Sequence, residues 1–348
     1  MTDAPPELLA VASRIDAALS EVFARERATW SKLDPAVDVP LADLEEFVAA
    51  GGKRIRPAYC HWGWVVGGGH PESDDALGGG CALELLHAFA LVHDDVMDGS
   101  PTRRGSPTVW SRFIQRHNEA RWQGEARRFG EAAAILVGDI AMVMADRCIG
   151  NASTDVRHVW DSLRTELNMG QYLDVLGTAR GAVTVEQADT IMRNKTAGYT
   201  IVRPLQLGAA LAGRADLADD LAAHGMPLGI AFQLRDDMLG AFGDSERTGK
   251  PVGDDLTEGK PTVLLALARE AASSAQLEVL DQVGGEIGGD EIAAIQQVMV
   301  DTGAVEASEA RTEQLLAEAL GAIDALPDHH GSREALRVLA DYVVERDT

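Results

Sequence analysis

Apolar residues recur at intervals of three and four along most of the chain, which is the spacing of one face of an α-helix. The first such segment, residues 7–28, places these apolar residues on one face: Leu8, Val11, Ile15, Leu19, Val22 and Phe23. The same periodicity marks the segments 77–98, 131–149, 156–177, 184–212, 216–242, 261–282, 289–302, 306–326 and 332–345. Alternating strand patterns are almost absent. The sequence therefore predicts an all-α fold, a single large bundle of ten or more helices forming one domain over residues 1–348.

Loops are expected where glycine, proline and charged residues gather. One follows Gly67-Gly68-Gly69, a second runs from Gly99 to Pro107, and a third covers residues 243–260. Residues 115–130 are rich in arginine, follow no clear period and are expected to be exposed. The role of the arginine-rich segment 112–128 does not follow from the sequence.

Composition narrows the class of protein. The chain has 348 residues, 46% of them hydrophobic, and 31 basic against 55 acidic residues, which gives a formal charge of −24. Such a charge argues against nucleic acid or anionic lipid as partners. Three cysteines without a CxxC pair, no signal-peptide pattern at the N-terminus and no apolar run of ~18 residues predict a soluble cytoplasmic protein without stable membrane insertion.

A first acidic cluster, His93-Asp94-Asp95-Val96-Met97-Asp98, ends an apolar helical segment. Asp94 and Asp98 are four residues apart, so they lie on one helix face and repel each other unless a cation lies between them. His87 precedes Asp94 by seven residues and shares that face. Oxygen ligands of this kind suit Mg²⁺. The alternative is a solvated helix end, but the apolar lead-in from Leu85 to Val92 argues that the helix is buried up to its acidic tip.

A second cluster about 140 residues later, Phe232-Gln233-Leu234-Arg235-Asp236-Asp237, repeats the arrangement. Gly240 stands where a paired aspartate would follow Asp236, and Asp244 is interpreted as a residue of the helix end or loop. Two acid-tipped helices facing each other would form a cage for metal ions and a diphosphate.

Basic residues accompany both clusters. Gly51-Gly52-Lys53-Arg54-Ile55-Arg56-Pro57 combines a glycine pair with three cations, of which Lys53 and Arg56 can point the same way. Further cations follow the clusters or occupy a predicted helix: Arg103, Arg104, Lys195, Lys250 and Lys260. Lysine supplies a point charge and arginine a planar fork, both suited to a diphosphate. Each residue alone would be read as surface charge.

Together these residues resemble the trans-isoprenyl diphosphate synthases, also called the polyprenyl synthetase family. The likeness spans about residues 45–265 and includes both acidic clusters, the Gly-Gly-Lys-Arg-Ile-Arg-Pro segment, Gly138-Asp139, Gly170-Gln171, Lys195-Thr196, Gly249-Lys250 and Gly259-Lys260. It implies helices around a deep central cavity, a homodimer, and a Mg²⁺-dependent condensation of isopentenyl diphosphate with an allylic diphosphate.

The resemblance also implies roles for single residues. A trinuclear Mg²⁺ cluster would be held by Asp94, Asp98 and Asp236, supported by Asp95 and Asp237. The allylic diphosphate would be bound by Arg103, Lys195, Lys260 and Lys250. Isopentenyl diphosphate would be bound by Lys53, Arg56, His87 and Arg104. Thr196 and Gln233 would line the region where positive charge develops.

The expected chemistry is loss of the allylic diphosphate, attack by the alkene and loss of a proton, with preorganised cations stabilising the leaving oxygen. No side chain stands out as the base, so the departed diphosphate is the hypothesis for that role. Gly240 departs from the full second motif, and we expect activity with a weaker metal site.

The length of the prenyl product is expected to depend on the cavity beneath the first cluster. Ala90 lies one turn below Asp94 and leaves space in this cavity, whereas Phe89 is bulky enough to narrow it. With one aromatic residue at this place, the chain resembles the geranylgeranyl (C20) synthases of the family. We predict C20, with farnesyl (C15) next and longer chains third. The alternative for Phe89 is plain core packing.

Two other classes of protein remain in view. A class I terpene cyclase would need an Asn/Ser/Glu metal triad where this chain has Asp236-Asp237. A non-catalytic regulatory subunit of a synthase would usually lack acidic motifs, and here the first is complete.

Overall fold

The computed structural model describes residues 4–103, 105–243 and 253–345. The N-terminal half contains α1 (Pro6–Trp30), η1 (Pro35–Val37), α2 (Asp38–Ala49), α3 (Ile55–Val66), α4 (Leu77–Met97), β1 (Thr102–Arg103), β2 (Ser106–Pro107), α5 (Val109–Glu119), α6 (Ala126–Ile149) and α7 (Thr154–Arg180). The C-terminal half contains α8 (Val185–Met192), the π-helix η2 (Arg193–Val202), α9 (Arg203–Leu211), η3 (Ala215–Leu217), α10 (Ala218–Phe242), α12 (Asp254–Glu258), α13 (Val263–Ala271), α14 (Ser274–Leu280), α15 (Gly289–Asp301), α16 (Ala304–Ala322), η4 (Ile323–Ala325) and α17 (Ser332–Val344).

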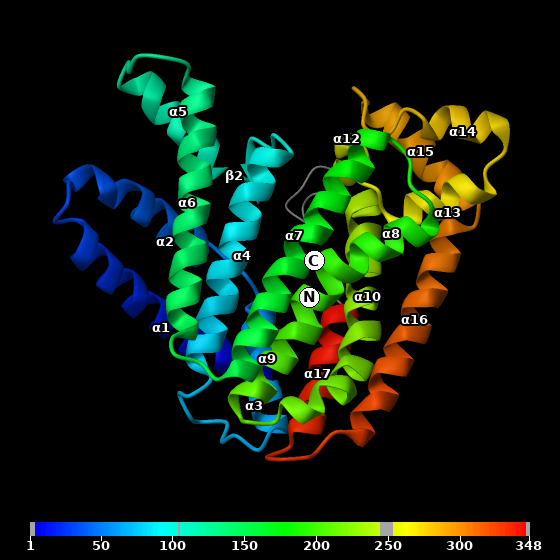
Figure 1. Ribbon diagram of the computed structural model, residues 1–348. Helices are drawn as coiled ribbons and strands as arrows, with labels where there is room; N and C mark the ends of the chain where they lie inside the picture. The colour runs from blue at the N-terminus through cyan, green and yellow to red at the C-terminus, as the bar shows by residue number, and fades with distance from the viewer. Residues whose placement is uncertain (1–3, 104, 244–252, 346–348) are drawn as a thin grey trace.

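The long helices form a bundle in which α4 packs on α6, and η2 packs between α7 and α10 (Figure 1). On the side of the bundle opposite α6, at the right of the picture, α10 packs on α16, and at the lower end α3 packs on α9. The C-terminal ends of α4 and α10 both point to the upper end of the bundle, where the β1–β2 hairpin and α12 follow them. The two predicted acidic clusters therefore reach the same end of the molecule.

Local sequence signals explain where several helices begin and how closely they approach. The side chain of Ser153 accepts from the Val156 amide and caps α7, and Thr184 and Gln187 form a capping box at the start of α8. Glycine allows α3 and α9 to touch. A Cβ at position 208 would lie only 1.9 Å from the Cys60 carbonyl oxygen.

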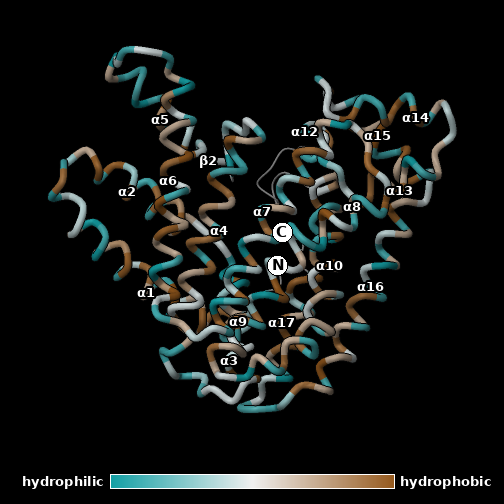
Figure 2. Tube along the Cα trace, viewed as in Figure 1, coloured by the Kyte–Doolittle hydropathy of each residue, from teal (hydrophilic) through white to brown (hydrophobic). Residues whose placement is uncertain are grey.

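Buried apolar side chains form several clusters, and the largest joins α1, α2, α4, α5, α6 and α7. Figure 2 shows hydrophobic and hydrophilic segments alternating along the helices. No helix in the described part of the chain combines the length and apolarity that a membrane crossing requires.

The all-α prediction is confirmed, but three segments differ in detail. Residues 115–130 are largely helical, because α5 continues to Glu119 and α6 starts at Ala126. The predicted helix 184–212 contains the π-helix η2 in its middle. The predicted helix 261–282 is divided into α13 and α14.

Candidate active site

The first acidic cluster occupies the last turn of α4. Asp95 is almost completely buried, with 1% of its surface exposed, whereas Asp98 is exposed at the end of the helix. Burial would raise the pKa of Asp94, but the charges of Lys195, Arg103 and Lys260 outweigh it and hold that pKa below its usual value. Although Asp98 stays partly open to water, the surrounding residues remove some of its hydration, and this loss and the charge of Asp94 raise its pKa to about 7. Asp94 and Asp98 are thus close enough to repel each other, as their spacing predicts.

Arg103 links the β1–β2 hairpin to this cluster. Its Nε donates to Asp95 Oδ1 over 2.8 Å, and its NH2 lies 3.6 Å from Asp94 Oδ2. Burial nevertheless raises the pKa of Asp95 to about 6, although Arg103 opposes the rise. Arg103 therefore stands directly beside the metal-ligand candidates.

Helix α7 and the π-helix η2 bring three more polar groups to the cluster. Lys195 Nζ donates to Asp174 Oδ2 over 2.5 Å and to Asp94 Oδ1 over 3.5 Å. Gln171 Nε2 donates to Asp94 Oδ1 over 2.7 Å. Burial would lower the pKa of Lys195, but the charges of Asp94 and Asp174 outweigh it and raise that pKa. The ammonium is therefore held charged next to the first cluster.

The second cluster lies near the end of α10. Asp237 is buried and accepts a hydrogen bond from Gln233 over 2.7 Å, and burial raises its pKa well above the usual value. Asp236 is exposed one residue before it.

Lys260 joins the two clusters electrostatically. It pairs with Asp255 over 3.0 Å and with Glu258 over 2.7 Å, and its charge acts on Asp94 and on Asp237 alike. Ser100, just after the first cluster, also donates to Glu258 over 3.3 Å. The ends of α4 and α10 therefore border one shared polar region.

Asp255 explains the glycine at position 240. A Cβ at Gly240 would lie 1.8 Å from Asp255 Oδ2 and 2.5 Å from its Cγ. Asp255 comes from α12 and is 9% exposed. The carboxylate of Asp255 thus occupies the space that a second-motif aspartate at position 240 would need.

The predicted isopentenyl diphosphate ligands approach η2 from another side. Arg56 donates to Thr200 Oγ1 over 3.0 Å, and its guanidinium lies 4.2 Å from the centre of the Tyr199 ring. His87 Nδ1 lies 3.0 Å from the Tyr199 hydroxyl. Lys53 lies in the loop before α3, 5.7 Å from the centre of the Tyr342 ring. Arg56 and His87 are thus brought together around Tyr199.

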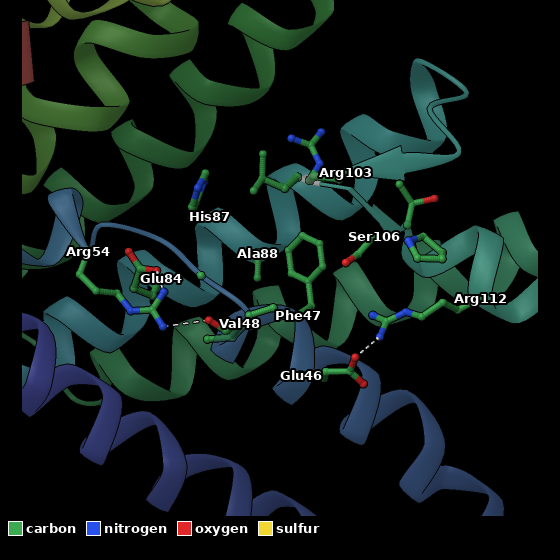
Figure 3. Close-up of a pocket in the computed structure, with 15 residues that line it drawn as sticks. Glu46, Phe47, Val48, Arg54, Glu84, His87, Ala88, Arg103, Ser106 and Arg112 are labelled. Atoms are coloured by element: carbon green, nitrogen blue, oxygen red, sulfur yellow. Dashed lines mark hydrogen bonds and ion pairs between the residues drawn. The ribbon is translucent and has the colours of Figure 1, made fainter. Parts of the chain in front are cut away.

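A pocket lies beside His87, between α2, α4 and the β1–β2 hairpin (Figure 3). Arg54 closes one end of it, with hydrogen bonds to Glu84 and to the Val48 carbonyl, both over 2.8 Å. From α4 it is lined by His87, Ala88 and Leu91. The chain-length candidates Phe89 and Ala90 lie outside its lining, and Phe89 packs on the His93 ring at 4.6 Å between centroids.

Some predicted residues stay without a structural placement, and others were missed. Arg104 and Lys250, like Asp244, lie outside the described residues. Thr196 is half-buried on η2, next to Lys195. Tyr199, Thr200, Asp174 and Asp255 were not among the predicted site residues. Only their spacing from Lys195, Gln171 and Lys260 could have drawn attention to them.

The arrangement fits a magnesium site that is completed by substrate. Among the residues that the structure describes, no three histidine, cysteine, aspartate or glutamate side chains come close enough to hold a metal by themselves. Mg²⁺ usually takes only one or two protein carboxylates, together with water and substrate phosphates. A cation between Asp94 and Asp98 would relieve their repulsion, and Asp95 Oδ2 is buried and has no hydrogen-bond partner among the residues that the structure describes.

Known proteins are similar to this chain in both sequence and fold. The short chain isoprenyl diphosphate synthase of Methanothermobacter thermautotrophicus is 33% identical over 337 residues, covering 93% of this chain and 96% of the relative. The geranylfarnesyl diphosphate synthase of Aeropyrum pernix is 31% identical over 310 residues, covering 86% and 92%. Other matches are named as farnesyl, geranylgeranyl and nonaprenyl diphosphate synthases and as component 2 of a heptaprenyl diphosphate synthase.

Among solved structures, the geranylgeranyl pyrophosphate synthase of Corynebacterium glutamicum, complexed with isoprenyl diphosphate and magnesium, is 39% identical. It superposes with a TM-score of 0.91 over 96% of this chain and 98% of its own. The family model of the polyprenyl synthetases matches residues 41–301. This chain belongs to the polyprenyl synthetase family.

Proposed function

We propose that the protein condenses isopentenyl diphosphate with an allylic diphosphate to give a trans-prenyl diphosphate, in a Mg²⁺-dependent reaction. The observation that carries this proposal is the contact between the two acidic helix ends. Ser100, just after the first cluster, donates to Glu258, Glu258 pairs with Lys260, and Lys260 pairs with Asp255 beside Gly240 of α10. Two acidic helix ends and half-buried lysines in one region suit a diphosphate with its counter-ions, as in relatives named for isoprenyl diphosphates.

Mg²⁺, held by Asp94, Asp98 and Asp236 with support from Asp95 and Asp237, would supply concentrated positive charge for the diphosphate. Arg103, Lys195 and Lys260 add fixed cations on the same side, and their carboxylate partners hold them in place. Such preorganised charges act most strongly where charge develops on the leaving oxygen, because they need no rearrangement during the reaction. Thr196 and Gln233 flank this region on η2 and α10. Lys250 belongs to the same proposed set.

Isopentenyl diphosphate is assigned to Lys53, Arg56, His87 and Arg104. Arg56 supports this assignment, because contacts with Thr200 and Tyr199 hold its guanidinium close to His87. A planar guanidinium held in this way suits a diphosphate.

The decisive experiment is turnover by the Asp94→Ala variant. The wild type should join labelled isopentenyl diphosphate to an allylic primer in Mg²⁺, and Asp94→Ala should lose activity by at least about a thousandfold, because it removes a ligand of the charge that stabilises the leaving group. Asp301→Ala, which removes an exposed acid at the end of α15, should keep wild-type turnover. Near-normal activity of Asp94→Ala would refute the metal assignment.

The same assay separates the other two classes. A terpene cyclase would convert the primer alone into a hydrocarbon, and a non-catalytic subunit would turn over neither substrate by itself. Asp236-Asp237 and the second set of cations at Lys53, Arg56 and His87 favour the prenyltransferase.

For product length we propose geranylgeranyl diphosphate (C20), ahead of farnesyl (C15) and longer products. The proposal rests on Phe89, a half-buried aromatic one turn before His93 on α4. Phe89→Ala should lengthen the main product by at least one isoprene unit, because it removes the bulk that narrows the cavity. Chromatography of dephosphorylated products measures this. An unchanged length would mean that another residue forms the floor.

We also propose a homodimer that works in the cytoplasm. Helix α6 exposes Ile135, Leu136 and Val143 with 43%, 61% and 52% of their surfaces accessible. Leu136 and Val143 line an apolar groove together with Trp30, Val37, Pro40 and Ile140. Apolar surface of this kind usually marks a protein interface. The free thiols of Cys60, Cys81 and Cys148 are compatible with a reducing compartment.

A further inference from the structure

The π-helix η2 passes through the centre of the site and is closely held on two sides. A Cβ at Gly170 of α7 would lie 2.5 Å from the Lys195 amide nitrogen, and a Cβ at Gly229 of α10 would lie 2.6 Å from Ala197 Cα. Both neighbouring helices therefore touch the η2 backbone directly. π-helical turns are rare and occur frequently at functional sites.

Two groups of contacts leave this one segment. Near its start, Lys195 pairs with Asp174 and Asp94 at the first acidic cluster. Near its end, Tyr199 and Thr200 contact His87 and Arg56. The two ends of η2 thus reach the residues assigned to the two different diphosphates.

Within the described residues, the ring face and the hydroxyl of Tyr199 contact two residues of one subsite. Its ring lies under the Arg56 guanidinium at 4.2 Å, and its hydroxyl lies 3.0 Å from His87 Nδ1. Only 5% of the residue is exposed, so the ring cannot swing away without disturbing the core. Thr200 is fully buried and accepts from Arg56 NH2 over 3.0 Å. These contacts fix the planes of the guanidinium and of the imidazole.

We propose that Tyr199 and Thr200 are positioning residues for isopentenyl diphosphate, acting through His87 and Arg56 while Lys195 of the same π-helix serves the allylic diphosphate. The inference rests on the proposed function and adds to it the residues that orient the second subsite. It predicts that the two subsites can be weakened separately, because Tyr199 and Lys195 act on different ligands.

The test is a comparison of Tyr199→Phe and Thr200→Val with the wild type. Each variant loses one hydrogen bond to a ligand-binding side chain and keeps most of its bulk. We expect the KM for isopentenyl diphosphate to rise roughly three- to tenfold, with the KM for the allylic primer unchanged. Calorimetry with isopentenyl diphosphate alone should show a matching loss of affinity. In a His87→Ala background, the effect of Tyr199→Phe should largely disappear.

Tyr59→Phe is the matched control. Tyr59 is also fully buried, but its hydroxyl has no hydrogen-bond partner in the described structure, so its removal should leave both KM values unchanged. Wild-type binding of isopentenyl diphosphate by Tyr199→Phe and Thr200→Val would overturn the inference alone. An equal rise of both KM values would also overturn it, because it would indicate general disturbance of η2. A wild-type protein that neither binds isopentenyl diphosphate nor turns over would overturn the proposed function as well.

Discussion

Gly240 is the residue at which this chain departs from a paired second motif, and the structure gives a steric reason. The Asp255 carboxyl occupies the space next to the glycine and also holds Lys260. A side chain at position 240 would have to push Asp255 aside, and a carboxylate there would repel it too. Position 240 and position 255 therefore act as one unit.

Gly240→Asp should therefore lower both stability and turnover. Overpacking of a filled site typically costs about 1–3 kcal/mol, and displacement of Asp255 would release Lys260 from its partner. Urea unfolding and steady-state kinetics measure the two effects.

The double variant Gly240→Asp/Asp255→Gly is the control for this prediction. It moves the carboxylate from α12 to α10 and removes the overlap, so it should recover most of the lost stability. If the double variant is as damaged as Gly240→Asp, the two positions do not share one space.

At the scale of elements, the loop between α2 and α3 is fixed by Arg54. This residue has a left-handed backbone, with φ of 53°, and its buried guanidinium binds Asp16 of α1, Val48 of α2 and Glu84 of α4. Burial raises the pKa of Glu84, and Arg54 opposes that rise. The loop that carries Lys53 and leads into Arg56 is thus tied to three helices.

Arg54→Met should destabilise the protein by about 3–5 kcal/mol, because it leaves the Glu84 carboxyl buried without its partner. Thermal and urea unfolding measure the loss. Arg25→Met removes an exposed pair with Glu21 at 3.9 Å and should cost less than about 1 kcal/mol. Arg54→Met/Glu84→Met should recover part of the stability. A cost for Arg54→Met no larger than that for Arg25→Met would contradict the anchoring role.

The sequence predicts helices better than it predicts their interruptions. The apolar patterns located α1, α4, α7 and α10 to within a few residues. In α1 and α7 the buried residues recur every three or four positions, whereas in α4 and α10 they form long continuous runs. These patterns did not reveal the π-helix η2, since widening a turn depends on packing against Gly170 and Gly229 from other helices. They also missed most of α5, where Arg116 binds Asp43 of α2.

The same limit applies to the site. Asp94, Asp98, Lys195 and Lys260 carry recognisable spacing and flanking residues, and they do gather in one region. Tyr199 owes its place in the site to contacts between segments far apart in the chain, since 112 residues separate it from His87. No local pattern encodes such a contact.

For the whole molecule, the net charge promotes solubility, whereas the exposed apolar surface marks a candidate protein interface. Most of the net charge of −24 lies outside the site, where it promotes solubility, while Lys195 and Lys260 are held beside the acidic clusters by buried partners. The groove beside α6 is lined mainly by apolar side chains, among them Leu136 and Val143, and two of its charged residues, Arg147 and Glu26, pair with each other. We expect a second copy of the chain to cover this apolar surface, because exposed apolar patches usually mark protein interfaces.

The proposed dimer can therefore be tested on that face. The double variant Leu136→Glu/Val143→Glu would bury two carboxylates in the interface, which costs several kcal/mol, so it should change the protein from dimer to monomer in light scattering coupled to gel filtration. Val300→Glu alters a similarly exposed valine on α15, with 51% of its surface accessible, and should remain a dimer. Because α6 packs on α4, the helix that carries Asp94 and Asp98, loss of the dimer should also reduce turnover. A wild type that is monomeric at micromolar concentration, or a double variant that stays dimeric, would show that this apolar face has another role.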